Sequence, residues 1–486
     1  MNDSKNSLES VVELFSSEDF LFKDGSAYYK QHLGPITQCT HINSQEMANI
    51  IRAKVRNKLD QRIRSKVIDE VKEELEAMAY EAPAFNGYLS QRVGLDSVSK
   101  SVLIDLGDEQ GHLVVFRNGK VEIIEDGDEF HHVHFLRSPQ MQPMILPLLE
   151  CDWREGIKLL KPYVNASINE LMMLIAYITY VLSHPKAVGV PYPILVIQAE
   201  KGSGKSFTSG NIIRGLTDPN SNSTLIFPRS NKDLAIHSNS SYVLMYDNMR
   251  SLNRNMSDLL CSVATGSSFA TRKLYADSDL SSISLHSPLV LNGIHSFVKE
   301  SDLADRCLRL SLAKMDEKNR RSERELKECR ARDLPIIFGS LLQLSALLLQ
   351  AEPNVKPVYS ASIMDFSVWL AAFELVAELP NGSLQKAYKD NVKSLSASGV
   401  EHDSLTIAFE KFIAMNCKDK TVWEGEPSEL LRMLQMLESS YGMPKTAASL
   451  TVKLKSQEAS FNAAGIYFLI GRSKKRFIKV AGKPFS

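Results

Sequence analysis

The sequence predicts an α/β protein built on a mainly parallel sheet, with an N-terminal α+β region and a separate C-terminal unit. Three observations support this prediction. From residue 190 to 312, apolar strand-like runs alternate with helical stretches, as in a parallel sheet whose connections are helices. Inside that span, a glycine-rich loop follows a buried strand and opens a helix. The segment 418–486 reads as two helices followed by an alternating hairpin.

The composition is that of a globular protein, with 486 residues, 44% hydrophobic and 23% charged, and 57 basic against 57 acidic residues. A chain of this length predicts about two to four domains. Its six cysteines form no C-x-x-C pair, which argues against a zinc site and a disulfide framework. The N-terminus lacks an apolar signal core, and the apolar run 171–182 is shorter than the roughly 20 residues that cross a bilayer. We expect a cytoplasmic protein with no membrane partner.

Two regions precede the predicted sheet. Residues 1–85 are expected to be mainly helical, because apolar residues recur every three or four positions from Ile63 to Met78. Residues 86–150 are expected to be β-rich, because short apolar runs alternate with Gly, Asn and Asp turn residues that predict hairpins. His132 and His134 would share one strand face there, and without a third ligand they are interpreted as surface residues and not as a metal site.

The central region, 151–345, carries the loop "AEKGSGKS" between the strand "PILVIQ" and a helix. Its glycines allow backbone amides to surround phosphate oxygens, and the positive end of the helix dipole faces the same anion. Lys205 would reach the β and γ phosphates, and the Ser206 hydroxyl would bind Mg²⁺. The first glycine of the usual motif is replaced by an alanine. The expected ligands are ATP and Mg²⁺, contacted by Ala199, Glu200, Lys201, Gly202, Ser203, Gly204, Lys205, Ser206 and Phe207.

Polar residues end the two following strands. "SYVLMYDN" ends in Asp247, whose carboxylate would hold Mg²⁺ through water. "SPLVLNGI" contains Asn292, whose amide could orient the attacking water. Farther along, Arg306 and Arg309 stand near the start of another strand, where an arginine could stabilise charge on a neighbouring subunit's ATP. The alternative is an arginine paired with a nearby aspartate.

These motifs resemble the AAA+ ATPases of phages and integrated mobile elements, which are related to superfamily 3 and poxvirus-type primase-helicases. The resemblance is strong over roughly residues 150–350, where the phosphate loop, the Asp-Asn strand end, "ATGSSFATRKLY", "LNGI" and "DLADR" follow in the family's order. It implies a homo-oligomeric ring, a hexamer, that acts on DNA during replication of a mobile genome. The implied catalytic positions are Lys205, Asp247, Asn248, Asn292 and Arg306, with Ser206 and Asp247 as metal ligands.

The resemblance also implies DNA contacts in the pore of the ring, made here by Arg272 and Lys273. A salt-bridged surface pair is the alternative interpretation of these two residues. One departure from the family concerns Asn248, since many AAA+ proteins have a glutamate base after the metal-binding aspartate. Either a neighbouring acid such as Glu200 or Asp258 replaces it, or water is merely positioned and hydrolysis is slow. No primase domain is evident, and whether a separate primase is a partner stays open.

Residues 346–417 are expected to be helical, and 418–486 look like a winged-helix DNA-binding module. From 441 to 486 there are nine lysines and arginines against the single acid Glu458. This concentration favours phosphate contacts by the second helix and the hairpin tip, including contacts to duplex DNA. A solubilising tail is the alternative. The expected DNA-binding residues of this module are Lys453, Lys455, Arg472, Lys474, Lys475 and Arg476.

Together these features predict an ATP-dependent DNA helicase or translocase of a phage or mobile element, with single-stranded DNA in the ring pore. Two other functions stay open. One is an ATP-controlled DNA-binding initiator without unwinding activity, which Asn248 favours. The other is the ATPase of an anti-phage defence system. A metabolic kinase is disfavoured, because a winged helix has no use there.

Overall fold

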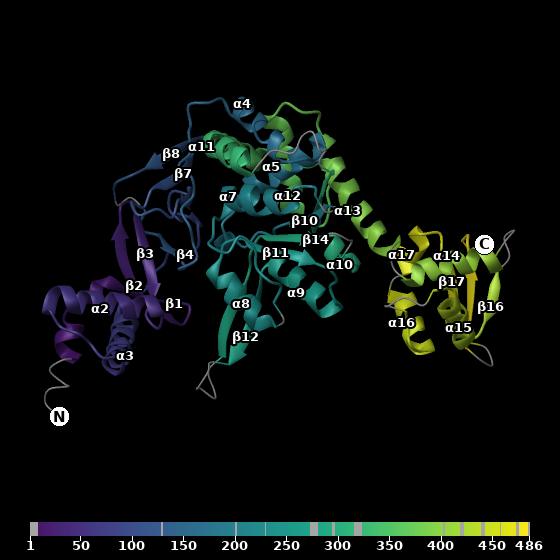
Figure 1. Cartoon of the computed structure of the whole chain (residues 1–486), viewed down its shortest axis with the longest axis horizontal. Coiled ribbons are helices and arrows are strands. Elements are labelled where there is room, and N and C mark those ends of the chain that lie inside the picture. The colour runs from purple at the N-terminus through teal and green to yellow at the C-terminus, as the bar shows by residue number, and fades with distance from the viewer. Residues whose placement is uncertain are drawn as a thin grey trace.

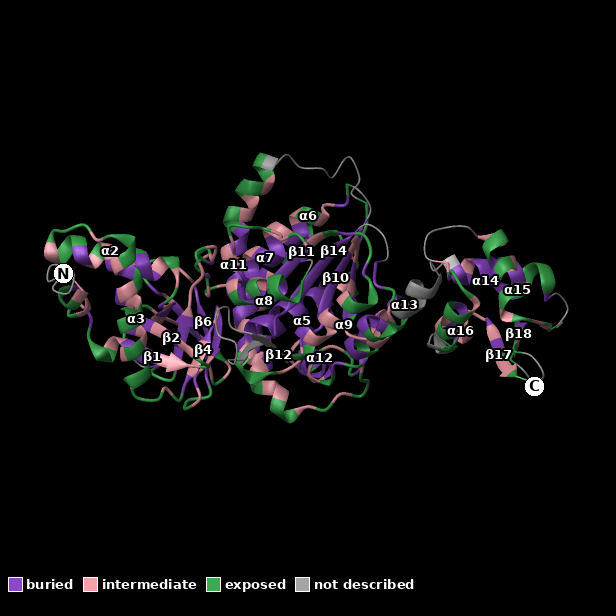
Figure 2. Cartoon of the chain, turned by 90° about the horizontal axis from the view of Figure 1, so that it is seen from below, coloured by how far each residue is buried: buried purple, intermediate pink, exposed green. Residues whose placement is uncertain are grey.

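The computed structural model describes residues 8–127, 130–199, 202–228, 230–272, 280–293, 297–314, 323–401, 404–417, 422–438, 443–456, 458–472 and 476–484. Along the chain, an N-terminal unit with two small sheets leads into a central parallel sheet wrapped by helices. The helix α13 (Ser383–Glu401) then leads from this core to a C-terminal unit (Figure 1). Buried residues concentrate in the central sheet and the helices against it (Figure 2).

The first 85 residues contain two long helices and also three strands, which the prediction of a mainly helical region did not include. Three strands form an antiparallel meander before two helices. The signal for the first hairpin is the pair Asp24 and Gly25, both with positive φ (51° and 75°), which is the turn chemistry of a tight hairpin. The elements are β1 (Phe20–Lys23), β2 (Ser26–Leu33), β3 (Ile36–His41), α2 (Gln45–Leu59) and α3 (Ser65–Glu81).

The predicted hairpins of the next region are confirmed as an antiparallel sheet of order β5-β6-β7-β8. The strand β9 instead joins the first sheet, between β3 and β4. His134 on β9 is buried and stacks on the Phe85 ring at 4.3 Å, so the surface interpretation was wrong for this histidine. The elements are β4 (Tyr88–Ser90), β5 (Val93–Leu95), β6 (Val102–Asp105), β7 (Leu113–Arg117), β8 (Lys120–Ile124) and β9 (Val133–Leu136).

The core is a parallel sheet in the order β11-β14-β10-β15, as the alternating pattern predicted. Because parallel strands are buried on both faces, β14 has no exposed residue and reads as a continuous apolar run. The main strands are β10 (Ile194–Ala199), β11 (Leu244–Met249), β14 (Leu289–Gly293) and β15 (Cys307–Leu312), and a separate hairpin consists of β12 (Ser267–Arg272) and β13 (Leu280–Leu285).

Helices cover both faces of this sheet (Figures 1 and 2). The apolar run predicted to be a buried helix is α5, in which every residue from Met173 to Ser183 is buried. The helix α11 is apolar and long enough to span a bilayer, but 61% of its most apolar window is buried inside the protein. The helices are α4 (Trp153–Lys158), α5 (Ile168–Ser183), α6 (Lys205–Phe207), α7 (Arg214–Thr217), α8 (Asn231–Ser240), α9 (Arg254–Thr265), α10 (Ser301–Ala304), α11 (Glu323–Ala351) and α12 (Met364–Val376).

The C-terminal unit has its own apolar core, which includes Leu405 and Phe409 from a helix that precedes residue 418. Its sheet has the order β16-β18-β17. The short strand β16 therefore pairs with β18, the second strand of the predicted hairpin. The predicted second helix corresponds to α16 and α17, which lie on either side of residue 457, a residue outside the described part of the chain. The elements are α14 (Ser404–Asn416), β16 (Trp423–Gly425), α15 (Pro427–Leu437), α16 (Ala447–Ser456), α17 (Glu458–Ala463), β17 (Tyr467–Arg472) and β18 (Arg476–Ala481).

Candidate functional site

The glycine-rich loop lies at the carboxyl edge of the central sheet, between the end of β10 and the start of α6. Ligands of open α/β sheets bind outside this edge. Gly202 and Gly204 have φ values of +87° and +81°, which an L side chain adopts only with strain. Gly204 begins the helix in this left-handed conformation, and its carbonyl accepts the Thr208 N–H at 2.9 Å. The two glycines therefore permit the tight turn that the motif requires. Glu200 and Lys201 lie outside the described residues.

Lys205 stands at the first position of α6, where it interacts electrostatically with the Asp247 carboxylate. Burial lowers the pKa of Lys205, and Asp247 opposes part of that shift. The nearby Ser206 is exposed, while Phe207 is half-buried and stacks against Tyr163 with ring centroids 6.4 Å apart. The loop therefore presents a cation and a hydroxyl beside a carboxylate. That set suits a phosphate together with a divalent cation.

Three buried polar atoms near the loop have no hydrogen-bond partner among the described residues. They are Ser203 Oγ in the loop, Gln198 Nε2 on β10 and Asn292 Oδ1 on β14. Ile197 is the residue opposite Asn292, so Gln198 and Asn292 are one position out of register on adjacent strands and their side chains point to opposite faces of the sheet. Buried polar groups usually find partners. The unpaired atoms of Ser203 and Asn292 therefore fit a site that is completed by a polar ligand, and the residues present fit a bound nucleotide.

The other amide atom of Asn292 is engaged, since Nδ2 donates to Ser209 Oγ at 3.3 Å. Ser209 belongs to a π-helical turn, Thr208–Ile213, that continues the loop helix. Such turns often mark functional sites. Asn292 is fully buried, so its side chain links the strand β14 to the helix that follows the phosphate loop. Ser203 was predicted as part of the phosphate loop, whereas Ser209 lies beyond the motif and carried no signal in the sequence.

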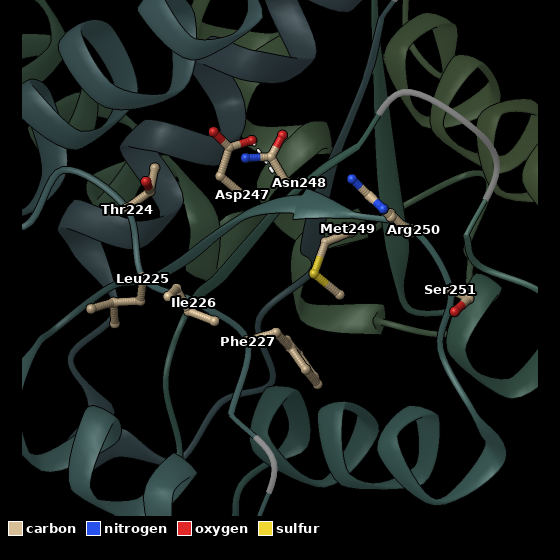
Figure 3. Close-up of a pocket in the computed structure, with 9 residues that line it drawn as sticks. All are labelled: Thr224, Leu225, Ile226, Phe227, Asp247, Asn248, Met249, Arg250 and Ser251. Atoms are coloured by element: carbon tan, nitrogen blue, oxygen red, sulfur yellow. Dashed lines mark hydrogen bonds between the residues drawn. The ribbon is translucent and has the colours of Figure 1, made fainter.

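Asp247 and Asn248 form a β-bulge at the end of β11. The pairing shifts there, because Tyr246 faces Leu291 while Met249 faces Gly293. Two residues thus stand opposite Asn292 alone, and Asn248 has a φ of +58°. The Asn248 N–H donates to Asp247 Oδ1 at 2.7 Å, and the two residues lie side by side in Figure 3. Bulges re-aim side chains near active sites. This one turns the exposed Asn248 side chain outward beside the half-buried Asp247.

A pocket of about 380 Å³ adjoins this bulge (Figure 3). One wall is the segment 247–251, which includes the end of β11 and the two residues after it, and the other is the segment 224–227. That segment lies parallel to β11, since the Leu225 N–H donates to Met245 O at 2.8 Å. Ile226 is 91% exposed at the rim. The pocket was not predicted from the sequence, because the pairing of 224–227 involves too few residues to leave a strand pattern.

Arg306 lies at the amino ends of the parallel strands, whereas the phosphate loop lies at their carboxyl ends. The strand that follows it, β15, is parallel to β10, and Cys307 pairs with Ile194 at the start of β10. Six residues of strand span roughly 20 Å, so Arg306 is about that far from the loop of its own chain. Its guanidinium donates to the main-chain oxygen of Asp302 and is half-buried. Arg306 and its own phosphate loop are therefore not brought together.

The second candidate arginine, Arg309, is turned away toward α13, where its Nη2 donates to Ser394 Oγ at 2.9 Å. The candidate base Asp258 is exposed on α9. It is an electrostatic neighbour of Cys261, as are Arg306 and Asp302. Asp258 thus lies one turn before Cys261 on α9, a helix that carries neither the phosphate loop nor Asp247.

The predicted DNA-contacting residues are only partly described. Arg272 ends β12 opposite Leu280 in a hairpin that projects from the core (Figure 1), and Lys273 lies outside the described residues. In the C-terminal unit, Lys455, Arg472 and Arg476 are exposed, while Lys453 is half-buried and has an interaction partner. Lys474 and Lys475 lie outside the described residues.

The fold and the site define a mixed α/β protein with a parallel sheet and a glycine-rich loop at its carboxyl edge. Residues 157–395, just under half of the chain, match the family model described as Actinomycete integrative conjugative element replication protein. The matched segment extends from α4 to α13 and includes the phosphate loop, Asp247, Asn292 and Arg306. No curated protein sequence matches the chain.

Solved structures also resemble this chain. A structure described as "SCCmec type IV Cch - active helicase" aligns with a TM-score of 0.46 and 11% identity, covering 96% of this chain and 98% of the other. The apo A form of the NrS-1 C-terminal region (residues 305–718 of that protein) aligns at 0.32 and 11% identity, with 80% of this chain and 96% of the other covered. A further structure of that region aligns at 0.31 and 10% identity, covering 76% of this chain and 94% of the other.

Proposed function

We propose that this protein is an ATP-dependent DNA translocase or helicase of the AAA+ type that acts in replication of an integrated mobile element. The observation that carries the proposal is the phosphate loop, whose Lys205 interacts electrostatically with Asp247 on β11 and near which the buried polar atoms Ser203 Oγ and Asn292 Oδ1 have no partner among the described residues. The family match over residues 157–395 supports a role in replication.

Each residue of the site has a role in this proposal. Backbone amides of the loop and Lys205 would bind the β and γ phosphates. Ser206 and Asp247 would hold Mg²⁺, which neutralises charge on the phosphates when it is bound. Asn248 and Asn292 would orient the attacking water from two adjacent strands. Because both are amides, they position water without accepting its proton.

Arg306 would complete the site of a neighbouring subunit. Its separation from the loop of its own chain, about the length of β10, supports action in trans. This arrangement requires a ring or another head-to-tail assembly, in which one edge of the sheet faces the opposite edge of the next subunit. A hexamer remains our expectation for its size.

DNA would contact two parts of the protein. The β12–β13 hairpin, with Arg272 at its end, is suited to a pore. The C-terminal unit runs in the order α14, β16, α15, α16, α17 and the β17–β18 hairpin, and β16 pairs with β18. This arrangement supports a winged-helix module. Its exposed cations, including Lys455, Arg472 and Arg476, would contact phosphates.

The test is ATP hydrolysis with and without single-stranded DNA, in wild type, Lys205→Ala and Arg306→Ala. Lys232→Ala and Arg324→Ala are matched controls, since both residues are exposed and belong neither to the phosphate loop nor to the strands that carry Asp247 and Asn292. We expect hydrolysis that DNA stimulates and that both site variants lose while the controls keep it. Mixing the two inactive variants should restore part of the activity, because each supplies what the other lacks. Failure to recover activity on mixing would contradict the trans site.

A second function, an ATP-controlled initiator without unwinding, is favoured by one observation, the amide of Asn248 where a carboxylate base is common. Slow hydrolysis that DNA does not affect, together with tight ATP binding, would support the initiator over the motor. Unwinding of a forked duplex would exclude it.

A further inference from the structure

The N-terminal unit carries a strongly charged surface at the junction of α2 and α3. Between residues 52 and 66 there are seven lysines and arginines and one acid, Asp60. The two helices are joined by five residues, 60–64, so the end of α2 and the start of α3 lie at the same end of the unit (Figure 1). We define the α2–α3 basic patch as the five exposed cations of this segment, Arg56, Lys58, Arg62, Arg64 and Lys66.

The two other cations of the segment, Arg52 and Lys54, contact the fold, in contrast to the α2–α3 basic patch. Arg52 donates to Asn49 Oδ1 at 3.1 Å. Lys54 donates to Leu14 O at 3.2 Å and lies 4.3 Å from the ring centroid of Phe15. Within the described part of the chain, the side chains of the α2–α3 basic patch form no ion pair or hydrogen bond. Their positive charges are therefore not used to hold the fold together.

The start of α3 departs from the usual chemistry of a helix N-terminus. Arg64 is the N-cap and makes no side-chain capping bond, and the first turn holds Lys66 but no acid. By contrast, α2 is capped by Ser44, whose Oγ accepts the Met47 N–H at 3.0 Å. Cations at a helix N-terminus oppose the helix dipole. Sites where local rules are broken are often functional, and uncapped amides beside cations suit an anion that carries phosphate.

The surroundings of the patch distinguish a nucleic acid from a membrane. An amphipathic membrane helix inserts an apolar face into lipid, but the apolar faces of α2 and α3 are buried, with Val55 at 2% and Ile68 at 1% exposure. The residues between the cations include exposed Asn57 and Gln61. Such amides commonly contact DNA phosphates along with lysine and arginine.

We propose that the α2–α3 basic patch is a DNA-binding surface that contacts the phosphate backbone without reading sequence. It would lie apart from the β12–β13 hairpin and from the C-terminal unit, and it would give the N-terminal unit a role in holding the substrate. The choice of DNA as the polyanion rests on the proposed function, whereas the existence of a polyanion site rests on the patch itself.

The test is binding of the full chain to a fluorescent DNA duplex of arbitrary sequence, without nucleotide, over a range of salt concentrations. The variant is Arg62→Ala, Arg64→Ala and Lys66→Ala together. A triple variant at scattered exposed lysines, Lys120→Ala, Lys161→Ala and Lys386→Ala, removes the same charge and serves as the control. We expect the patch variant to bind more weakly and to reduce the slope of log affinity against log salt by about 2 to 3, because each lost phosphate contact removes about 0.9.

Unchanged affinity and slope in the patch variant would overturn the proposal, and so would an equal loss in the control. Phosphatidylserine vesicles test whether the patch binds a membrane instead of DNA. If the patch variant loses vesicle binding but keeps its DNA binding, the proposal is also overturned. Arg64→Ser distinguishes an effect on binding from an effect on folding, because it removes a cation of the patch while serine can still cap α3. It should weaken DNA binding without lowering the melting temperature.

The binding assay needs no hydrolysis, so the two proposals can fail separately. Loss of DNA binding in the patch variant, in a chain that shows no ATPase activity, would support the surface and reject the motor. Normal DNA-stimulated ATPase, together with unchanged DNA binding in the patch variant, would support the motor and reject the DNA-binding surface.

Discussion

The side-chain amide of Asn391 on α13 binds both backbone groups of Arg309 on the edge strand β15. Its Oδ1 accepts the Arg309 N–H at 2.8 Å, and its Nδ2 donates to Arg309 O at 2.8 Å. One side chain thus takes the place of a neighbouring strand at this edge of the sheet. Since Arg306 precedes the same strand, α13 is fastened to the element that positions the proposed trans arginine.

We predict that Asn391→Ala lowers the free energy of unfolding by about 1–3 kcal/mol, because it leaves two backbone groups without partners. It should also reduce ATP hydrolysis, since the strand after Arg306 loses its support. Denaturant unfolding and steady-state ATPase measure the two effects. Lys393→Ala, at an exposed position of the same helix, is the control and should change neither. A stable but inactive Asn391→Ala would contradict the structural part of this prediction.

Arg92 is a buried link between the N-terminal unit and the core. Its Nε lies 3.2 Å from Asp218 Oδ1, and its guanidinium also donates to four main-chain oxygens, of residues 105, 106, 142 and 219. We predict that Arg92→Ala lowers the free energy of unfolding by about 3–5 kcal/mol, because it breaks one of the two buried ion pairs of Asp218, the other being with Arg214, and leaves four main-chain oxygens without this donor.

The exposed pair of Arg154 with Glu378, at 3.0 Å, is the comparison for Arg92. Arg154→Ala should cost no more than about 1 kcal/mol, since solvent screens that pair. Unfolding in urea measures both variants, and equal losses would contradict the assignment of Arg92 as the link.

The parallel sheet and the phosphate loop could be predicted from the sequence because their signals are local. A buried apolar run followed by glycines and a lysine fixes strand, turn and helix within about 15 residues. The strands of the first 85 residues were missed because the periodic pattern of α3 dominated that region, while the hairpin signal of Asp24 and Gly25 occupied only two positions. Boundaries of this kind depend on turn chemistry.

Features that depend on pairing between distant segments could not be predicted. The bulge at Asn248 exists only because β11 pairs out of step with β14, and no pattern within β11 reveals it. Likewise, the distance from Arg306 to the phosphate loop follows from the parallel pairing of β15 with β10. The basic segment 52–66 was visible in the sequence, but its exposure at one end of the unit follows from the packing of both helices.

Lys186 gives a pH dependence of stability. Its Nζ donates to Gln91 Oε1 at 2.8 Å and to Ser241 O at 3.0 Å. Burial lowers the pKa of Lys186 to about 7, and Asp218 opposes part of that shift. Between about pH 7 and the ordinary lysine pKa near 10.5, the unfolded chain holds a proton that the folded chain has released. Stability should therefore rise with pH in this window, and below about pH 7 this group adds no pH dependence.

The variant Lys186→Met should remove that rise and should cost about 1–3 kcal/mol at pH 7, because it leaves buried acceptors unpaired. Lys161→Met, at an exposed position, should keep the rise. Urea unfolding at several pH values between 6 and 10 measures both. The same slope in wild type and Lys186→Met would contradict the assignment.

Arg64→Ser should raise the free energy of unfolding by about 0.5–1 kcal/mol, because serine supplies the missing cap of α3 and removes a cation from its N-terminus. Thermal unfolding measures the change. Arg56→Ser is the control, since Arg56 lies in the last turn of α2, where a cation is favourable; it should leave stability unchanged or lower it. A loss of stability in Arg64→Ser would contradict the account of α3.

Substitutions at Asn248 can change its chemistry and keep its backbone conformation, because glycine and aspartate also adopt a φ of +58°. Asn248→Gly keeps the bulge and removes only the amide. We predict that it lowers ATP turnover about 10- to 100-fold with little change in the KM for ATP, since misplaced water costs that much.

Asn248→Asp has the same shape as the native side chain and adds a carboxylate that can accept a proton. It should hydrolyse ATP at least as fast as wild type, because a general base contributes up to about 10²–10⁴ in rate. Steady-state ATPase, with ATP binding measured separately, tests the pair of variants. Wild-type turnover in Asn248→Gly would show that the amide has no part in hydrolysis. A slow Asn248→Asp beside a slow Asn248→Gly would instead mean that the amide's hydrogen-bond donor is what the water requires.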